Sequence, residues 1–160
     1  MKDVRTAPER AVEAFYTVEI NDWAAVIAVL EDGRIPLIRQ YRPAVERFLC
    51  EFPAGAVPDG ERPDEVARRE LREEAGCEAD ELVPLGRVYP EGGRLTSRAW
   101  TYFAPAARVV SAPEPHPDED LELVFVHPEE LRALIDGGEF ASGGHLAAVA
   151  LALIRNELPL

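Results

Sequence analysis

Apolar and polar positions along the chain alternate in short segments, and this pattern predicts many strands and few helices. Residues 24–30 form a continuous apolar run, which indicates a buried strand ended by the turn at residues 31–33. Residues 34–40 are predicted to return as the hairpin partner of this strand. The other strands are predicted at residues 15–20, 48–52, 82–89, 99–104 and 121–126.

Three segments have the periodicity and the end signals of helices. The first is residues 63–75, where Pro63 suits the first helical position and Gly76 suits the C-terminal cap. Residues 127–137 and 142–156 are the other two, and the last helix is expected to pack on the sheet. Strands that alternate with few helices predict an α/β fold, with a mixed sheet between helices.

Three glutamates of the first helix lie on one side of it. At about 100° per residue, Glu70, Glu73 and Glu74 fall within an arc of about 100°, next to an apolar stripe. Like charges at this spacing cost a few tenths of a kcal/mol per pair, so arginines, solvent or a divalent cation must compensate them. On charge pattern alone, a solvated and salt-bridged helix face is the simpler interpretation.

The spacing of residues before and within this helix is more specific than the charge pattern. Gly55 is followed after five residues by Glu61, and after seven more by the run Arg69-Glu-Leu-Arg-Glu-Glu-Ala-Gly-Cys77. This pattern resembles the Nudix box, G-x5-E-x7-R-E-U-x-E-E-x-G-U with U apolar, and it meets every fixed position. One departure is Arg62, where related proteins often carry a serine that caps the helix.

The resemblance implies a Nudix α/β/α sandwich with a mixed β-sheet and a hydrolase that opens a pyrophosphate bond with a divalent metal. Mg²⁺ is the expected ion, with Mn²⁺ as a substitute, since Mg²⁺ prefers hard oxygen ligands. Glu70 and Glu74 are expected to be direct ligands, and Glu73 is expected to be a ligand or to hold the attacking water. The backbone carbonyl of Ala54 is expected to complete this part of the site.

A further carboxylate is expected from the proline-rich acidic loop at residues 111–120. Composition alone favours a solvated connector there. In the family that the chain resembles, however, an acidic loop directly before a strand supplies a carboxylate to metal or water. Glu119 fits the ligand and general-base position best, and Asp118 is the other candidate; either must lie within hydrogen-bond reach of the water.

Residues 37–55 resemble the ADP-ribose pyrophosphatase branch of the family, in which a Q-Y-R turn leads into E-x-P-A-G. This resemblance implies a nucleoside diphosphate sugar as substrate, split into a nucleoside monophosphate and a sugar phosphate. The candidates for substrate contacts are Tyr41, Arg42, Arg94 and Arg98, because arginine binds phosphate through paired hydrogen bonds. Arg98 stands where the branch usually has an acidic residue, and similar loops occur among relatives that act on other nucleotide sugars.

Two other functions remain open at this point. The box binds pyrophosphate and metal rather than base or sugar, so dinucleoside polyphosphates or damaged nucleoside triphosphates are alternative substrates. A nucleotide-sugar sensor that binds without cutting is an alternative of another class, because a fold does not by itself give a function. The complete set of box acids argues against the sensor.

Length and charge narrow the class of protein and partner. The chain of 160 residues suits one domain over residues 1–160, with residues 1–20 as an N-terminal arm or strand. Many relatives are homodimers with crossing N-terminal strands, a role that residues 15–20 are expected to take. The formal net charge of −13 argues against nucleic-acid or anionic-membrane partners, so a phosphate-bearing small molecule needs a bridging metal.

The cysteines and histidines show no metal-site spacing. Cys50 and Cys77 sit in apolar patterns and are expected to be buried free thiols, which fits a reducing cytoplasm. No export signal or membrane-spanning run is recognised. His116, His127 and His145 share no ligand spacing and are interpreted as surface or helix-capping residues.

Overall fold

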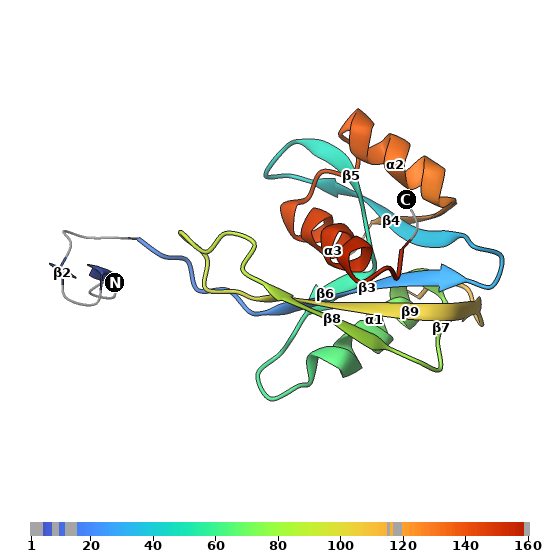
Figure 1. The fold of residues 1–160 in the computed structure, drawn as a ribbon, viewed down its shortest axis with the longest axis horizontal. Coiled ribbons are helices and arrows are strands. Elements are labelled where there is room, and N and C mark those ends of the chain that lie inside the picture. The colour runs from blue at the N-terminus through green and yellow to red at the C-terminus, as the bar shows by residue number, and fades with distance from the viewer. Residues whose placement is uncertain (1–4, 8–9, 12–15, 115, 117–119, 159–160) are drawn as a thin grey trace.

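The computed structural model describes residues 5–7, 10–11, 16–114, 116 and 120–158 of the chain (Figure 1). The helices are α1 (Pro63–Ala75), α2 (Pro128–Gly137) and α3 (Gly143–Ile154). The strands are β1 (Arg5–Ala7), β2 (Arg10–Ala11), β3 (Trp23–Leu30), β4 (Ile35–Arg42), β5 (Arg47–Glu51), β6 (Ala54–Ala56), β7 (Cys77–Glu78), β8 (Val83–Val88), β9 (Ala99–Val109) and β10 (Leu121–Val126).

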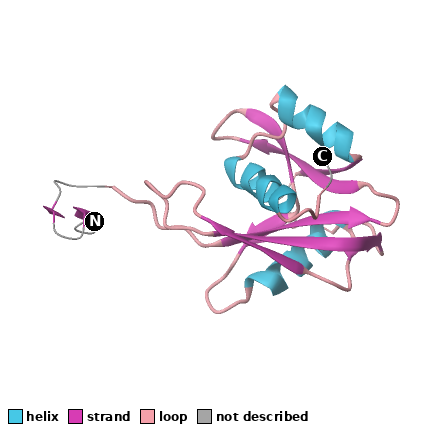
Figure 2. Cartoon of the chain, in the orientation of Figure 1, coloured by secondary structure: helices cyan, strands magenta, loops and turns pink. Residues whose placement is uncertain are grey.

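The body of the molecule is built on two sheets. The larger has the strand order β6-β3-β9-β7, with β8 also paired to β9, and the smaller has the order β10-β4-β5. Strands β3 and β9 run parallel, whereas β6 is antiparallel to β3, so the larger sheet is mixed. Helix α1 covers one face of the larger sheet, and α3 lies on the other face, beside the smaller sheet (Figures 1 and 2). The predicted α/β class is confirmed.

Strand β3 is buried on both of its faces, as its continuous apolar run predicts. Alternate residues belong to different cores: Val26 packs with Leu71 of α1, and Ile27 packs with Phe140 and the residues of α3. Burying apolar area stabilises a fold by about 25 cal/mol per Å². Because β3 buries both of its faces, the cores on both sides of the sheet depend on it.

Two of the strand predictions are wrong. Residues 34–40 do not pair with β3 beyond the turn closed by the Leu30 N–H and the Arg34 carbonyl; β4 pairs with β10 and β5 instead. The reason is that β9 and residues 53–56 occupy the two edges of β3. Residues 16–20 form one isolated bridge, from Val18 to Leu95, because their neighbour is a loop of turns rather than a strand.

Helix α1 has the bounds and the caps that its sequence predicts. It runs from Pro63 to Ala75, and Arg62 at its N-cap forms no side-chain capping bond. Gly76 ends the helix in the left-handed conformation with φ of 61°. The apolar stripe is buried, with Leu71 only 1% exposed, so the helix cannot roll without uncovering it. Glu70 and Glu74, which lie beside this stripe, are thereby held toward the sheet.

Replacing Gly76 by alanine should lower the free energy of unfolding by about 2 kcal/mol, the combined cost of left-handed strain and of overpacking. The added Cβ would overlap the backbone carbonyl oxygen of Ser111. Gly138 is a matched control, because it also caps a helix with positive φ, but no atom of the described residues lies within 4 Å of the added Cβ. Denaturant titration should therefore show a clearly smaller loss for Gly138→Ala, and equal losses would contradict this account.

The two thiols are placed as predicted. Cys50 and Cys77 are buried and free, and burial raises the pKa of the Cys77 thiol to about 11. The helices in the described part of the chain all lack the length and apolar character needed to span a bilayer.

Candidate active site

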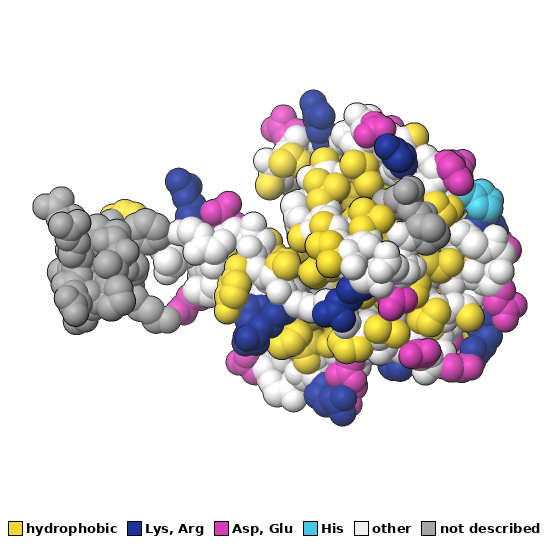
Figure 3. Space-filling view, in the orientation of Figure 1, with side chains coloured by type: hydrophobic (Ala, Val, Ile, Leu, Met, Phe, Trp, Pro, Cys, Tyr) yellow, Lys and Arg dark blue, Asp and Glu magenta, His cyan; other side chains and the backbone are white. Residues whose placement is uncertain are grey.

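A cleft of about 760 Å³ opens where the two sheets and the start of α3 meet. Figure 3 shows a notch on this side of the body, bordered by apolar side chains. The lining comes from several separate parts of the chain and includes Asp22, Trp23, Arg42, Val45, Leu49, Glu51, residues 54–56, Pro90 and residues 141–145. The cleft thus collects residues that are far apart in sequence.

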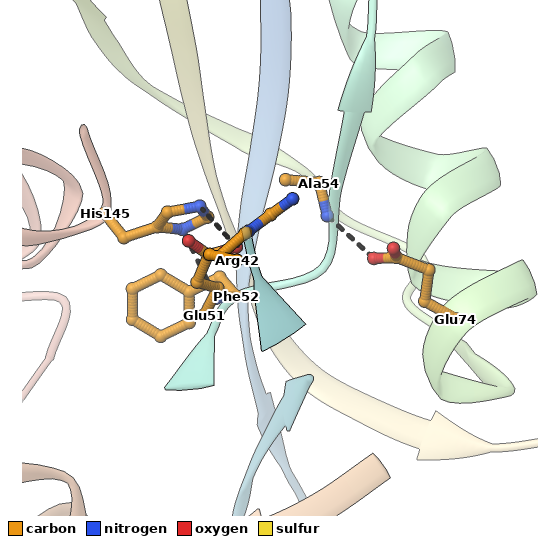
Figure 4. Close-up of polar contacts among 6 residues, drawn as sticks. All are labelled: Arg42, Glu51, Phe52, Ala54, Glu74 and His145. Atoms are coloured by element: carbon orange, nitrogen blue, oxygen red, sulfur yellow. Dashed lines mark hydrogen bonds and ion pairs between the residues drawn. The ribbon is translucent and has the colours of Figure 1, made fainter. Parts of the chain in front are cut away.

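The box helix approaches the back of this cleft through two of its glutamates. Glu74 is 7% exposed, and its Oε2 accepts a hydrogen bond of 2.9 Å from the Ala54 N–H (Figure 4). The Glu70 side chain is 14% exposed and lies so close to Gly55 that a Cβ there would overlap its carboxylate. Residues 54 and 55 therefore stand between the helix carboxylates and the cleft.

Arg69 supplies the positive charge that the clustered acids need. Its guanidinium lies 2.7 Å from Glu61, 3.4 Å from Glu70 and 3.9 Å from Glu73. The hydrogen bond to Glu61 raises the pKa of Arg69. Glu73 differs from the other two box glutamates because its side chain is 48% exposed. The face predicted from helical periodicity is thus divided into two inward carboxylates and one outward carboxylate.

The donor set at residues 54, 70 and 74 consists of hard oxygens and suits a small divalent cation. Mg²⁺ is commonly held by one or two carboxylates together with water. Within the described ranges, no three His, Cys, Asp or Glu residues converge as a complete metal site. Asp118 and Glu119, the acids predicted from the proline-rich loop, lie outside the described residues. The ligand roles of Ala54, Glu70, Glu73 and Glu74 therefore stay predictions.

On the other side of Ala54, Glu51 is buried in an ion pair with Arg42. The Arg42 Nε donates to Glu51 Oε2 at 3.1 Å, and a second guanidinium nitrogen binds the same oxygen. The His145 Nε2 lies 3.9 Å from this oxygen, and its Nδ1 accepts a hydrogen bond of 3.3 Å from the Phe52 N–H (Figure 4). Strand β5, which overlaps the strand predicted at residues 48–52, thus carries Glu51 to the cleft.

The prediction that His145 is a surface or capping residue is wrong, because its side chain is 4% exposed. Its ring packs against Trp23 with centroids 5.1 Å apart. The signal that was missed is the pair of glycines before it: a Cβ on Gly144 would overlap the Trp23 indole, so only glycine lets the first turn of α3 approach so closely. By contrast, His127 does cap α2, as predicted.

The four predicted substrate-contact residues are not brought together. Arg42 lines the cleft, whereas Tyr41 packs edge-on against Phe48 and Arg94 is exposed elsewhere. Arg98 binds Asp22, with 2.7 Å between its Nε and Oδ2, and borders a separate hollow of about 410 Å³.

Asp22 lies between the cleft and this separate hollow and is strongly held. It accepts hydrogen bonds from the Arg98 N–H at 2.8 Å and from the Trp100 indole at 3.1 Å. Burial alone would raise the pKa of Asp22, but these bonds and the Arg98 charge together lower it below its usual value. Arg98 is therefore engaged in fixing the start of β3.

Two relatives of known sequence are pyrophosphatases of ADP-ribose or of ADP-sugars. The chain is 33% identical over 116 residues to the ADP-ribose pyrophosphatase of Bacillus subtilis, a match that covers 72% of this chain and 63% of that protein. It is 31% identical over 124 residues to the ADP-sugar pyrophosphatase of Mus musculus, covering 72% of this chain and 57% of that protein. The matches thus span about 60% of the length of these relatives.

The solved structure of an ADP compounds hydrolase superposes with a TM-score of 0.71 at 23% identity, over 92% of this chain and 77% of that one. This likeness confirms the fold that the box resemblance implies. The NUDIX domain family matches residues 21–146, a range that contains β3, the box helix and the first turn of α3. On the strength of this match, the chain belongs to the Nudix family.

Proposed function

We propose that this Nudix protein hydrolyses the pyrophosphate bond of ADP-ribose or a related nucleoside diphosphate sugar, releasing a nucleoside monophosphate and a sugar phosphate. The observation that carries the proposal is the position of the Glu70 and Glu74 carboxylates directly behind residues 54 and 55 at the cleft. The names of the B. subtilis and M. musculus relatives support the substrate class.

The charges that line the cleft support a metal-dependent reaction. Among the described residues that line it, Arg42 is the one arginine or lysine, and Asp22 and Glu51 are acidic. A diphosphate entering this cleft meets no net positive charge from the protein. A bound Mg²⁺, or Mn²⁺ in its place, would neutralise the phosphates and lower the pKa of a bound water.

The predicted metal ligands, catalytic acids and Arg42 each have a role in this reaction. Glu70, Glu74 and the Ala54 carbonyl would hold the metal, and Arg42 would orient a phosphate by paired hydrogen bonds. Glu73, with Glu119 or Asp118, would position the attacking water and accept its proton. Arg94 and Arg98 stay predictions as phosphate or terminal-sugar contacts, and Tyr41 stays a prediction as a substrate contact.

The size and character of the cleft suit a nucleotide sugar. Sites for small ligands commonly span about 300–1,000 Å³ and have mainly apolar walls with few polar groups. This cleft has a volume of about 760 Å³, and Trp23, Val45 and Leu49 offer apolar surface for a base or a sugar ring.

The test is a panel of nucleoside diphosphate sugars, dinucleoside polyphosphates and nucleoside triphosphates, each assayed with Mg²⁺ and with Mn²⁺. We expect a nucleoside diphosphate sugar to have the highest kcat/KM, with a nucleoside monophosphate as product and no turnover in EDTA. A tenfold preference for either of the other substrate classes would replace the proposed substrate. Tight binding of a nucleotide sugar without any phosphomonoester product would instead indicate a sensor.

A homodimer is also proposed, with the segment before β3 in the contact. Tyr16, Val18 and Ile20 carry large apolar side chains that are 76%, 55% and 47% exposed, an arrangement that a partner chain would cover. Sedimentation velocity at micromolar concentration should give the mass of two chains, and Val18→Glu should shift the profile toward one. A single-chain mass for the unmodified protein would contradict the dimer.

Action in a reducing cytoplasm also stays a prediction, supported by the two buried free thiols.

A further inference from the structure

His145 has no part in the proposed chemistry, yet it occupies a central position behind the cleft. Three aromatic rings surround it: the centroids of Trp23, Phe52 and Phe140 lie 5.1, 6.0 and 6.2 Å from that of the imidazole. The charged groups that act on it are Glu51 of β5 and Arg42 of β4. Burial lowers the pKa of His145 to about 4, so the ring is neutral at pH 7.

The hydrogen bond to the backbone fixes the tautomer of this neutral ring. Because Nδ1 accepts the Phe52 N–H at 3.3 Å, the proton of the imidazole is on Nε2. Nε2 in turn lies 3.9 Å from Glu51 Oε2. A movement of about 1 Å would bring the two atoms to hydrogen-bond distance. His145 therefore presents an N–H donor to the same carboxylate oxygen that Arg42 binds.

Ligand binding at Arg42 would weaken the ion pair that this oxygen of Glu51 makes, which is unfavourable for a buried carboxylate. Glu51 is 6% exposed, and its ionised carboxylate is compensated by Arg42, whose side chain is 45% exposed and lines the cleft. If a ligand phosphate draws the guanidinium into the cleft, the carboxylate stays behind in a buried position. A buried charged group that loses its partner is strongly unfavourable unless another donor replaces that partner.

We propose that His145 is a positioning residue for Arg42: its Nε2–H closes on Glu51 Oε2 when Arg42 turns to a ligand phosphate, so that the arginine is released without leaving the carboxylate unpaired. This inference rests on the function proposed above. It assigns His145 a role in substrate affinity, exerted through Glu51, rather than a role in the chemical step.

Two substitutions separate the two nitrogens of the ring. The amide of asparagine reaches the place of Nδ1, so His145→Asn retains an acceptor for the Phe52 N–H and loses the donor toward Glu51. The amide of glutamine reaches the place of Nε2, so His145→Gln retains that donor. We expect His145→Asn to raise KM for ADP-ribose about tenfold with kcat within twofold, since the effect is on binding alone. His145→Gln should restore KM to within about threefold of the original value.

A double-mutant cycle and a binding measurement complete the test. Glu51→Gln removes the charge that needs compensation, so adding His145→Asn to it should change KM less than twofold. Calorimetric titration with ADP and Mg²⁺ should show the same tenfold weakening for His145→Asn as the kinetics do. Agreement of all three measurements supports the proposal.

The inference and the proposed function fail in different measurements. Absence of both hydrolysis and ADP binding in the unmodified chain would overturn both. Normal hydrolysis by the unmodified chain, with KM unchanged in His145→Asn, would overturn the role of His145 alone. An equal loss in the asparagine and glutamine variants would also overturn it, because the donor at Nε2 would then not be the cause.

Discussion

Replacing Glu74 by glutamine should reduce kcat for a nucleoside diphosphate sugar about 1,000-fold at saturating Mg²⁺, since charge stabilisation by a bound metal is worth several kcal/mol and each ~1.4 kcal/mol is tenfold. Glu74 is the box carboxylate with the least exposure, and it is held at Ala54 by a 2.9 Å hydrogen bond. Glutamine retains an oxygen that accepts this hydrogen bond. The fold should therefore persist while the negative charge is lost.

The measurements for this variant are steady-state kinetics and thermal unfolding with increasing Mg²⁺. The unmodified chain should be stabilised by Mg²⁺, and Glu74→Gln should lose most of this stabilisation, because only the native state holds the ion. Glu65→Gln is the matched control: Glu65 is exposed, lies in the first turn of the same helix and is outside the cleft lining. Unchanged turnover of Glu74→Gln at saturating Mg²⁺ would refute its assignment as a ligand.

The elements were predictable where their signals are local. Helix α1 has both of its end signals, Pro63 and Gly76, within its own sequence, and the bounds follow from them. Strand β10 at Leu121–Val126 has the bounds that the pattern of apolar and polar positions predicts. In both cases the residues that decide the structure are neighbours along the chain.

The pairing of strands was less predictable because it depends on competition between distant segments. The hairpin expected for residues 34–40 satisfies every local rule. It is displaced because β9, which begins only at Ala99, takes one edge of β3 and residues 53–56 take the other. Strand β4 then pairs with β10 and β5 in the smaller sheet. A single sequence does not rank such alternatives.

In the candidate site, too, features that depend on neighbouring residues were predictable, and features that depend on distant segments were not. The spacing of the box placed Glu70 and Glu74 on one helix face, and the structure has both facing the loop at residues 54 and 55. Spacing alone could not show that Glu73 would be exposed on that face, since exposure depends on what packs beside it. His145 was missed for a related reason: its environment is made by residues of β3 and β5, which no pattern around residue 145 reveals.

Gly55 lies against the carboxylate of Glu70 of the box helix. Replacing Gly55 by alanine should lower the activity strongly while changing the free energy of unfolding little. The new Cβ would overlap the carboxylate of Glu70, which is the mobile end of a long side chain. Rotation of that side chain costs only about 1 kcal/mol, and the lower entropy of the unfolded chain offsets part of it. The free energy of unfolding should thus stay within about 1 kcal/mol of the original value, while kcat/KM falls about 100-fold because Glu70 is displaced from the site.

Gly137→Ala is the control for this variant, because its backbone conformation is not left-handed and, in the part of the chain that the structure describes, no atom lies within 4 Å of the added Cβ. It should leave both stability and hydrolysis unchanged. Chemical denaturation and kinetics on the three proteins then give a clear decision. If Gly55→Ala retained most of its activity, Glu70 would not act from the position it holds beside residue 55, and the metal site would have to be built from Glu74 with acids elsewhere in the chain.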